Sequence, residues 1–102
     1  MQKAVTYISF PDLQDFPDDH LFKTNVKEFL ETDMPARVAD PEEWHRQFEA
    51  LDFLRMMNKY HTDVLVNNIL NFAKFIKESI ENLRSGISKN ALMFTTEFFN
   101  NS

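Results

Sequence analysis

Histidines and carboxylates are the side chains of this sequence that could support acid–base catalysis or metal binding. His45 and Glu49 stand four residues apart, which would place both on one face of a helix, but no third ligand follows at a suitable spacing. His61 and Asp63 form an equally isolated pair. Asp18-Asp19-His20 precedes a predicted helix, where acidic side chains usually cap free backbone amides. We therefore predict no catalytic residue, no metal site and no cofactor.

The composition excludes several other kinds of functional site. The 102 residues include no cysteine, which rules out disulfides and thiolate metal sites, and one glycine, which is too few for a glycine-rich phosphate loop. No arrangement of Ser, His and Asp suggests a nucleophilic triad at this length. The sequence is predicted to belong to a protein that is not an enzyme.

The net charge of −5 is unevenly distributed along the chain. Residues 1–43 hold ten acidic and four basic side chains, a balance of −6, whereas residues 44–102 hold six acidic and seven basic ones, a balance of +1. An acidic chain without a basic stripe is a poor binder of nucleic acid, because phosphate neutralisation supplies most of that affinity. No apolar run is long enough to span a membrane, and no signal peptide is visible at residues 1–10. We expect a cytoplasmic protein whose partner is another protein.

The elements that must position any binding residue are predicted to be helices. Eleven Phe residues require burial, and one Gly and four Pro are too few for the frequent turns of a small sheet protein. Residues 1–17 are the exception, because residues 4–10 have strand-like composition without a second strand to pair with and residues 11–17 contain two prolines. The sequence predicts an extended arm over residues 1–17 and a helical domain over residues 18–102.

Two helices are predicted in the first half of this domain. One begins after Asp18 or Asp19 and ends near Thr32, because Pro35 disfavours helical geometry at the residue before it. The next begins at the capping box Asp40-Pro41-Glu42-Glu43 and runs to about residue 60. Its apolar positions cover much of its circumference, which is typical of a helix packed between neighbours.

Two further helices are predicted in the second half. The third spans residues 62–82, and the fourth begins at Ser85 or Ser88 and runs to Phe98. The short turn at residues 82–86 has the length that joins antiparallel helices. The fold class predicted from this pattern is all-α, with HEAT- or armadillo-like helical hairpins stacked as an α-solenoid.

Two segments within the predicted helices resemble the repeat motifs of TOG domains. Residues 44–55, WHRQFEALDFLR, resemble the family's first repeat, in which a Trp precedes A-L-x-x-L-R. Residues 82–92, NLRSGISKNAL, resemble its second repeat, L-R-S-x-V-x-[KR]-x-A. The motifs begin about 38 residues apart, which suits successive HEAT repeats. The resemblance is closest to the cytoplasmic-linker-associated and the crescerin-type ciliary proteins, and it covers residues 41–99, as the first two repeats only.

The resemblance implies a scaffold that binds tubulin or microtubules, in the cytoskeleton or a cilium, through the loops inside each helix pair. In that family, the Trp that opens the second helix of the first repeat contacts tubulin, and Trp44 holds this position. The turn and helix start of the second repeat add polar and basic contacts, which correspond to Arg84, Ser85 and Lys89. A Trp in the first turn of a helix projects beyond the buried stripe, and Trp and Arg are common binding hot spots.

Each of these residues also has a structural interpretation. Trp44 could pack into the core, as most single tryptophans do. Arg84 could bond to loop carbonyls or to a carboxylate of the neighbouring repeat, and Lys89 could be a solvated residue of the first turn. The sequence alone leaves both interpretations open.

The arm and the end of the chain allow an alternative function. Apolar residues of the arm, such as Tyr7 and Phe10, could form a docking peptide for a partner, or could pack along the helices of the same chain. The segment Phe98-Phe99 could expose an open apolar end. In that case the chain would be a general HEAT-type adaptor that docks another protein or self-associates.

Overall fold

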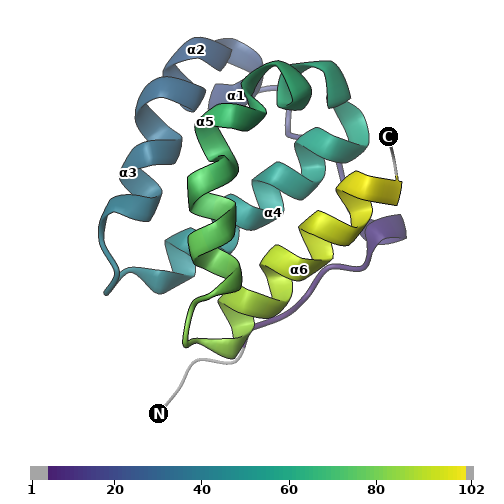
Figure 1. Ribbon diagram of the computed structural model, residues 1–102. Coiled ribbons are helices and arrows are strands. Elements are labelled where there is room, and N and C mark those ends of the chain that lie inside the picture. The colour runs from purple at the N-terminus through teal and green to yellow at the C-terminus, as the bar shows by residue number, and fades with distance from the viewer. Residues whose placement is uncertain (1–4, 101–102) are drawn as a thin grey trace.

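The computed structural model describes residues 5–100, and residues 1–4 of the predicted arm and residues 101–102 lie outside the described part (Figure 1). None of the described residues is in a strand, and the predicted all-α class is confirmed. The helices are α1 (Leu21–Thr24), α2 (Val26–Glu28), α3 (Met34–Ala39), α4 (Trp44–Tyr60), α5 (Thr62–Ile80) and α6 (Ser85–Asn100). A 3₁₀ turn (Phe10–Asp12) interrupts the arm, and a π-helical turn (Phe29–Asp33) joins α2 to α3.

The first helical segment begins later and is less regular than the sequence predicted. His20, rather than an aspartate, caps α1, because its Nδ1 accepts a hydrogen bond of 3.0 Å from the amide of Phe22. Asn25 then leaves helical geometry and caps α2 through its own side chain. Because of this break, Phe22 is buried but Val26, four residues later, is exposed.

The predicted helix end near Thr32 is wrong, since helical backbone continues through Pro35 to Ala39. A proline inside an α-helix would clash with the carbonyl four residues earlier. Here the preceding turn is π-helical, with the amide of Met34 bonded to the carbonyl of Phe29, and Pro35 lies in the first turn of α3. The wider turn accommodates the ring and shortens the linker to α4 to residues 40–43.

The predicted start of α4 is also corrected, because Asp40-Pro41-Glu42-Glu43 forms a turn and α4 begins at Trp44. The Asp40 carboxylate accepts a hydrogen bond from the amide of Glu42, and the Asp40 carbonyl accepts one from the amide of Glu43. A proline following an aspartate suits the second position of such a turn as well as the first turn of a helix. The same residues thus carry both signals, and in the structure they form the turn.

The helices form two hairpins, α3–α4 and α5–α6, that lie side by side. Figure 1 shows α5 between α3 and α6, with α4 behind it. The hairpin turns are short, residues 40–43 and 81–84. The bounds of α5 and α6 agree with the sequence prediction to within two residues, because both helices carry strong apolar periodicity.

The core lies between these hairpins and is built from apolar side chains of every helix except α2. The side chains buried there are Phe16, Phe22, Phe29, Met34, Phe48, Ala50, Leu51, Leu54, Met57, Leu65, Phe72, Ile87, Ala91 and Phe94. Burying an aromatic or large aliphatic side chain contributes roughly 1.5–3 kcal/mol each. This aromatic-rich core places most of the eleven Phe residues that the composition required to be buried.

A buried charged network closes the contact between α4 and α6, which we call the closed seam. Arg55 is 0% exposed and makes a bidentate ion pair with Glu97, at 2.8 Å from Nε to Oε1 and 2.7 Å from Nη2 to Oε2. Asp52 lies beside it and accepts a hydrogen bond from Asn90 Nδ2 at 3.0 Å. Burial raises the pKa of the Asp52 carboxyl, against the opposing effects of Asn90 and of the Arg55 charge. Paired in this way, the two helices are held in one register.

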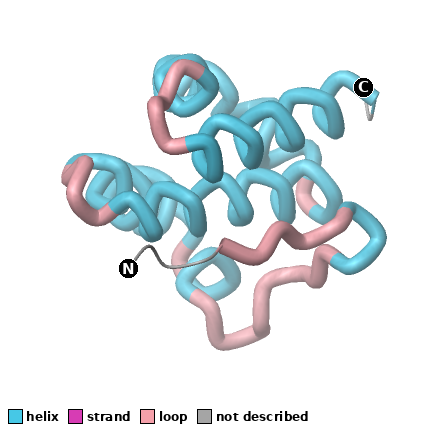
Figure 2. Tube along the Cα trace, turned by 90° about the horizontal axis from the view of Figure 1, so that it is seen from below, coloured by secondary structure: helices cyan, strands magenta, loops and turns pink. Residues whose placement is uncertain are grey.

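The arm forms a third layer on the outer face of α4 and α6. Figure 2 shows it running beneath the helices, and its rings pack against them, with Tyr7 edge-on to Phe48 at 5.6 Å between centroids. The Lys59 ammonium donates to the backbone carbonyls of Phe10, Pro11 and Leu13 at 2.8–3.2 Å. The arm therefore packs along its own helices, one of the two arrangements that the sequence left open.

Candidate protein-binding edge

Trp44, the predicted anchor, opens α4 directly after the hairpin turn. Its side chain is partly buried and packs against the core. The ring of His45 stands edge-on to it at 6.2 Å, and His45 Nε2 lies 3.3 Å from a carboxylate oxygen of Glu43. The position combines both interpretations of the sequence, since the indole is neither wholly enclosed nor wholly free.

Arg84 ends the turn between α5 and α6, Ser85 is the first residue of α6, and both residues are exposed. The Asn82 side chain accepts a hydrogen bond of 2.8 Å from the amide of Arg84, and the hydroxyl of Ser88 donates to the carbonyl of Ile80 at 2.8 Å. These two bonds fix the turn from both sides. The backbone that presents Arg84 is thus ordered by its own side chains, in the way that Asn and Ser commonly order turns.

The two turns meet at one edge of the molecule. The guanidinium carbon of Arg84 lies over the indole of Trp44, 5.2 Å from its centroid. This is a cation–π contact between residues 40 positions apart, and it joins the first residue of α4 to the residue that precedes α6. We call the surface formed by Trp44, Arg84 and Ser85 the Trp–Arg edge.

Lys89 belongs to a neighbouring surface. It lies one turn further along α6, where its ammonium is 4.5 Å from the ring centroid of Tyr7 in the arm. The chain's one glycine, Gly86, lies beside this contact, and a β-carbon there would come within 3.2 Å of a methyl group of Val5. The structure therefore places Lys89 with the arm, next to the Trp–Arg edge.

Sequence reasoning missed the involvement of the arm in this region. A signal was present in Gly86, because a glycine inside a helix often marks the close approach of another segment. The position of the arm itself carried no periodic pattern that could have located it. The contact depends on the third layer, which becomes visible only once the fold is known.

The Trp–Arg edge carries charges of both signs. The α3–α4 turn contributes the exposed acids Asp40 and Glu42, and Glu81 is exposed at the end of α5. The guanidinium of Arg84 makes no ion pair with any of the described residues. Arg84 is therefore an exposed cation whose described contact is with the indole of Trp44.

The histidines singled out in the sequence take up structural roles in the described residues. His61 Nε2 lies 2.6 Å from the Asp15 carboxylate of the arm, and His20 caps α1. Partial burial raises the pKa of the Asp15 carboxyl, but hydrogen bonds from His61 and Lys23 outweigh it, so that the pKa lies below its ordinary value. Residues 5–100 contain no group of three His, Asp or Glu side chains that could hold a metal ion.

Comparison with known proteins yields partial sequence similarity. The chain is 31% identical over 65 residues to the TOG array regulator of axonemal microtubules protein 1 of Homo sapiens, and 29% identical over 63 residues to the protein of the same name from Mus musculus. Each match covers 62% of this chain and 4% of the relative, so the chain spans about 4% of the length of these relatives. No protein-family model and no solved structure matches. Within the described residues, no helix is both long and apolar enough to cross a membrane.

Proposed function

We propose that this chain is a non-enzymatic, TOG-like scaffold module that binds tubulin or microtubules through the Trp–Arg edge. The observation that carries the proposal is the contact of Arg84 with Trp44, because it joins two residues of separate motifs into one surface. The partial similarity to proteins named as regulators of axonemal microtubules supports the same class of partner. A cytoplasmic location, on the cytoskeleton or in a cilium, follows from that partner.

The architecture in this proposal is a pair of HEAT-type repeats. Each hairpin would be one repeat, with α3 and α5 as the first helices and α4 and α6 as the second. The hairpin turns of both repeats then fall on one edge, which is the position of intra-repeat loops in a solenoid. The side-by-side arrangement of the hairpins supports this assignment.

The physical basis of recognition would be an aromatic anchor beside a cation. Interface hot spots are enriched in Trp and Arg, and a half-buried indole loses little side-chain entropy on binding. Arg84 would meet a carboxylate on the acidic surface of tubulin, while the acids of the α3–α4 turn would restrict the orientations in which an acidic partner can dock. Lys89 would extend the basic surface if Tyr7 moved aside.

Co-sedimentation with microtubules and gel filtration with free tubulin test the proposal. We expect Trp44→Ala and Arg84→Glu each to weaken binding by about tenfold or more, as loss of a hot spot does. Lys27→Glu on α2 is a matched charge reversal at an exposed residue away from the edge, and Leu70→Ala is a matched loss of exposed apolar surface. Both controls are expected to bind like the wild type.

The stability of each variant must be measured alongside its binding. Because Trp44 packs against the core, its truncation lowers the melting temperature, whereas Arg84 is exposed and its reversal leaves the fold intact. Equal pelleting by the wild type and by a folded Arg84→Glu or Trp44→Ala variant, or no pelleting by any of them, would remove this binding mode.

A second candidate function is favoured by apolar residues exposed on α5 and α6. Leu70 is 88% exposed, Leu92 49% and Phe99 69%. Exposed apolar residues of this kind would suit an adaptor that docks another helical hairpin or a second copy of the chain. Light scattering at rising concentration tests self-association, and a monomer at all concentrations would contradict it.

A further inference from the structure

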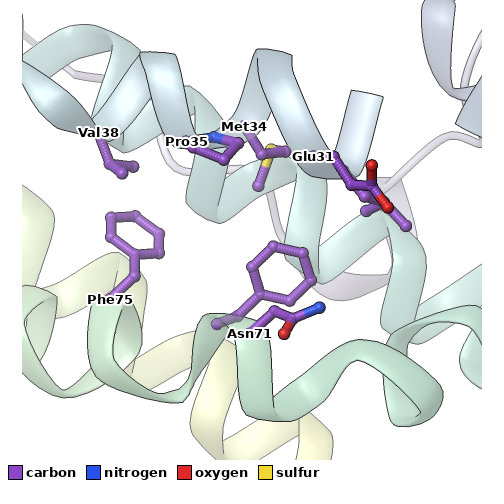
Figure 3. A pocket seen from close by; sticks show the side chains of 8 residues that line it. Glu31, Met34, Pro35, Val38, Asn71 and Phe75 are labelled. Carbon is purple, nitrogen blue, oxygen red and sulfur yellow. The ribbon is translucent and has the colours of Figure 1, made fainter. Parts of the chain in front are cut away.

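An apolar groove runs between α3 and α5, on a different part of the molecule from the Trp–Arg edge. Figure 3 shows side chains of α3, such as Pro35 and Val38, facing Asn71 and Phe75 of α5 across it. Its volume is about 360 Å³, within the range of ligand-binding clefts. We call this the open groove, and its lining residues are Leu30, Glu31, Met34, Pro35, Val38, Asn71, Phe72 and Phe75.

The groove owes one of its walls to the π-helical turn. Phe29, the first residue of that turn, is fully buried in the core, while the following Leu30 and Glu31 line the groove. Pro35 completes the wall one turn later. Single π-helical turns inside α-helices occur frequently at functional sites, because the extra residue redirects the side chains around it.

The lining has the chemistry of a peptide-binding groove, with an apolar floor and polar groups at the rim. Met34 and Phe72 are buried at its base, and Val38 and Phe75 are half-buried along its sides. Glu31 is exposed at one end, and no described residue gives its carboxylate an ion pair or hydrogen bond. An occupant that placed a cation there would be complementary in charge.

The groove is elongated along α5. A second hollow shares Val38, Asn71 and Phe75 with it and continues past Lys74 and Glu78 to Ser79. From Asn71 to Ser79 the helix rises by about 12 Å, which is room for roughly two to three turns of another helix. A helix of that length presents apolar side chains at positions i, i+3 and i+7 on one face.

We propose that the open groove binds a short amphipathic helix of another protein, with large apolar side chains on one face and a Lys or Arg placed to meet Glu31. The apolar face would cover Val38 and Phe75, and the cation would pair with the carboxylate at the end of the groove. This site is separate from tubulin binding and does not depend on it. It would allow the module to hold a second partner while the Trp–Arg edge is occupied.

A labelled synthetic peptide tests the site by fluorescence anisotropy. The probe has about 12 residues, with Leu at helical spacing i, i+3 and i+7 and with Lys and Ala at the other positions, and its control carries Glu in place of every Lys. We expect Val38→Glu to weaken binding of the basic peptide by about tenfold or more. Leu70→Glu places the same charge on α5 outside the groove and is expected to leave the affinity unchanged.

Reversal of the rim charge provides a second variant that does not threaten the core. Glu31→Lys is expected to weaken the basic peptide about fivefold and to strengthen the acidic control, because the charge relation is inverted. The proposal is overturned if the wild type binds neither peptide, if both peptides bind equally, or if Val38→Glu and Leu70→Glu lose binding alike. A dimer in sedimentation that Val38→Glu dissociates would assign the groove to a second copy and overturn it as well.

Discussion

The two hairpins face each other at two places, between α4 and α6 and between α3 and α5, and the two places differ in structure. Where α4 meets α6, the closed seam holds a fully buried arginine in a bidentate ion pair, and the arm covers its outer side. Where α3 faces α5, a π-helical turn and a proline shape the wall, and the side chains leave a groove of about 360 Å³. In the closed seam the polar groups bind the hairpins to each other, whereas the open groove leaves apolar surface and a carboxylate available to a partner.

The difference shows how a chain of this size can combine stability with an open surface. A small domain buries a limited share of its unfolded surface, so each exposed apolar residue has to be offset elsewhere. Here the closed seam and the arm provide the additional stability. We therefore expect damage to the closed seam to cost stability and damage to the open groove to cost binding.

The largest expected effect is at the buried arginine. Arg55→Ala leaves the carboxylates of Glu97 and Asp52 without their cation in a water-poor site, and such a loss costs about 3–5 kcal/mol. Urea denaturation followed by circular dichroism measures it. The triple variant Arg55→Met, Asp52→Asn and Glu97→Leu removes all three charges, and its free energy of unfolding is expected to lie within about 1 kcal/mol of the wild-type value. A loss below about 1 kcal/mol in the single variant would contradict the role of the network.

Truncation of one side chain in the buried core and of one in the open groove tests the difference in stability between the two regions. Leu51→Ala, in the fully buried part of α4, is expected to cost about 2–5 kcal/mol because it leaves a cavity. Phe75→Ala, in the wall of the open groove, is expected to cost about 1 kcal/mol, because its side chain is already partly exposed to water. Thermal melts of both variants decide the matter, and equal losses would mean that the groove is part of the core.

The arm is expected to contribute less to the stability of the fold than the closed seam does. Lys59→Met keeps the apolar stem but removes the ammonium that donates hydrogen bonds to three carbonyls of the arm. We expect the free energy of unfolding to fall by about 1–2 kcal/mol. Amide hydrogen exchange is expected to rise in the arm before it rises in α4. Unchanged protection of the arm would show that its apolar contacts, with Phe16 at their centre, hold it without the lysine.

The smallest effect is a pH dependence at the junction of the arm with α5. The pKa of Asp15 is lowered in the folded state, so its contribution is present above the unfolded value of about 3.9 and is lost as the pH falls through the folded one. Asp15→Asn is therefore expected to destabilise the protein at neutral pH and to match the wild type in strong acid. A difference between the two that is the same at both pH values would contradict the role of the carboxylate.

The sequence predicted the second hairpin better than the first, for a physical reason. In α5 and α6, apolar periodicity, turn length and the polar residues of the turn all point to the same structure. Around Pro35 and Pro41 the local signals conflict, since each proline suits a turn as well as the start of a helix. The structure continues the helix at Pro35, where α3 packs against α4, and forms a turn at Pro41, and a local pattern does not contain that distinction.

Part of the candidate site was predictable from the sequence, and part was not. The sequence placed Trp44 and Arg84 at helix starts, and the structure brings them into contact because the two hairpins lie side by side. It could not place Lys89 with Tyr7, because that contact crosses from the arm to α6. Nor could it reveal the open groove, which depends on the irregular turn between α2 and α3.

A double-mutant cycle on tubulin binding tests most directly whether the two hairpin turns act as one surface. The dissociation constant would be measured for the wild type, Trp44→Ala, Arg84→Ala and the double variant, each checked for folding. We expect both single changes to weaken binding, and the double change to cost less than their sum by about 0.5–1 kcal/mol, because the indole orients the guanidinium. Binding that neither change weakens, or losses that simply add, would contradict a shared edge.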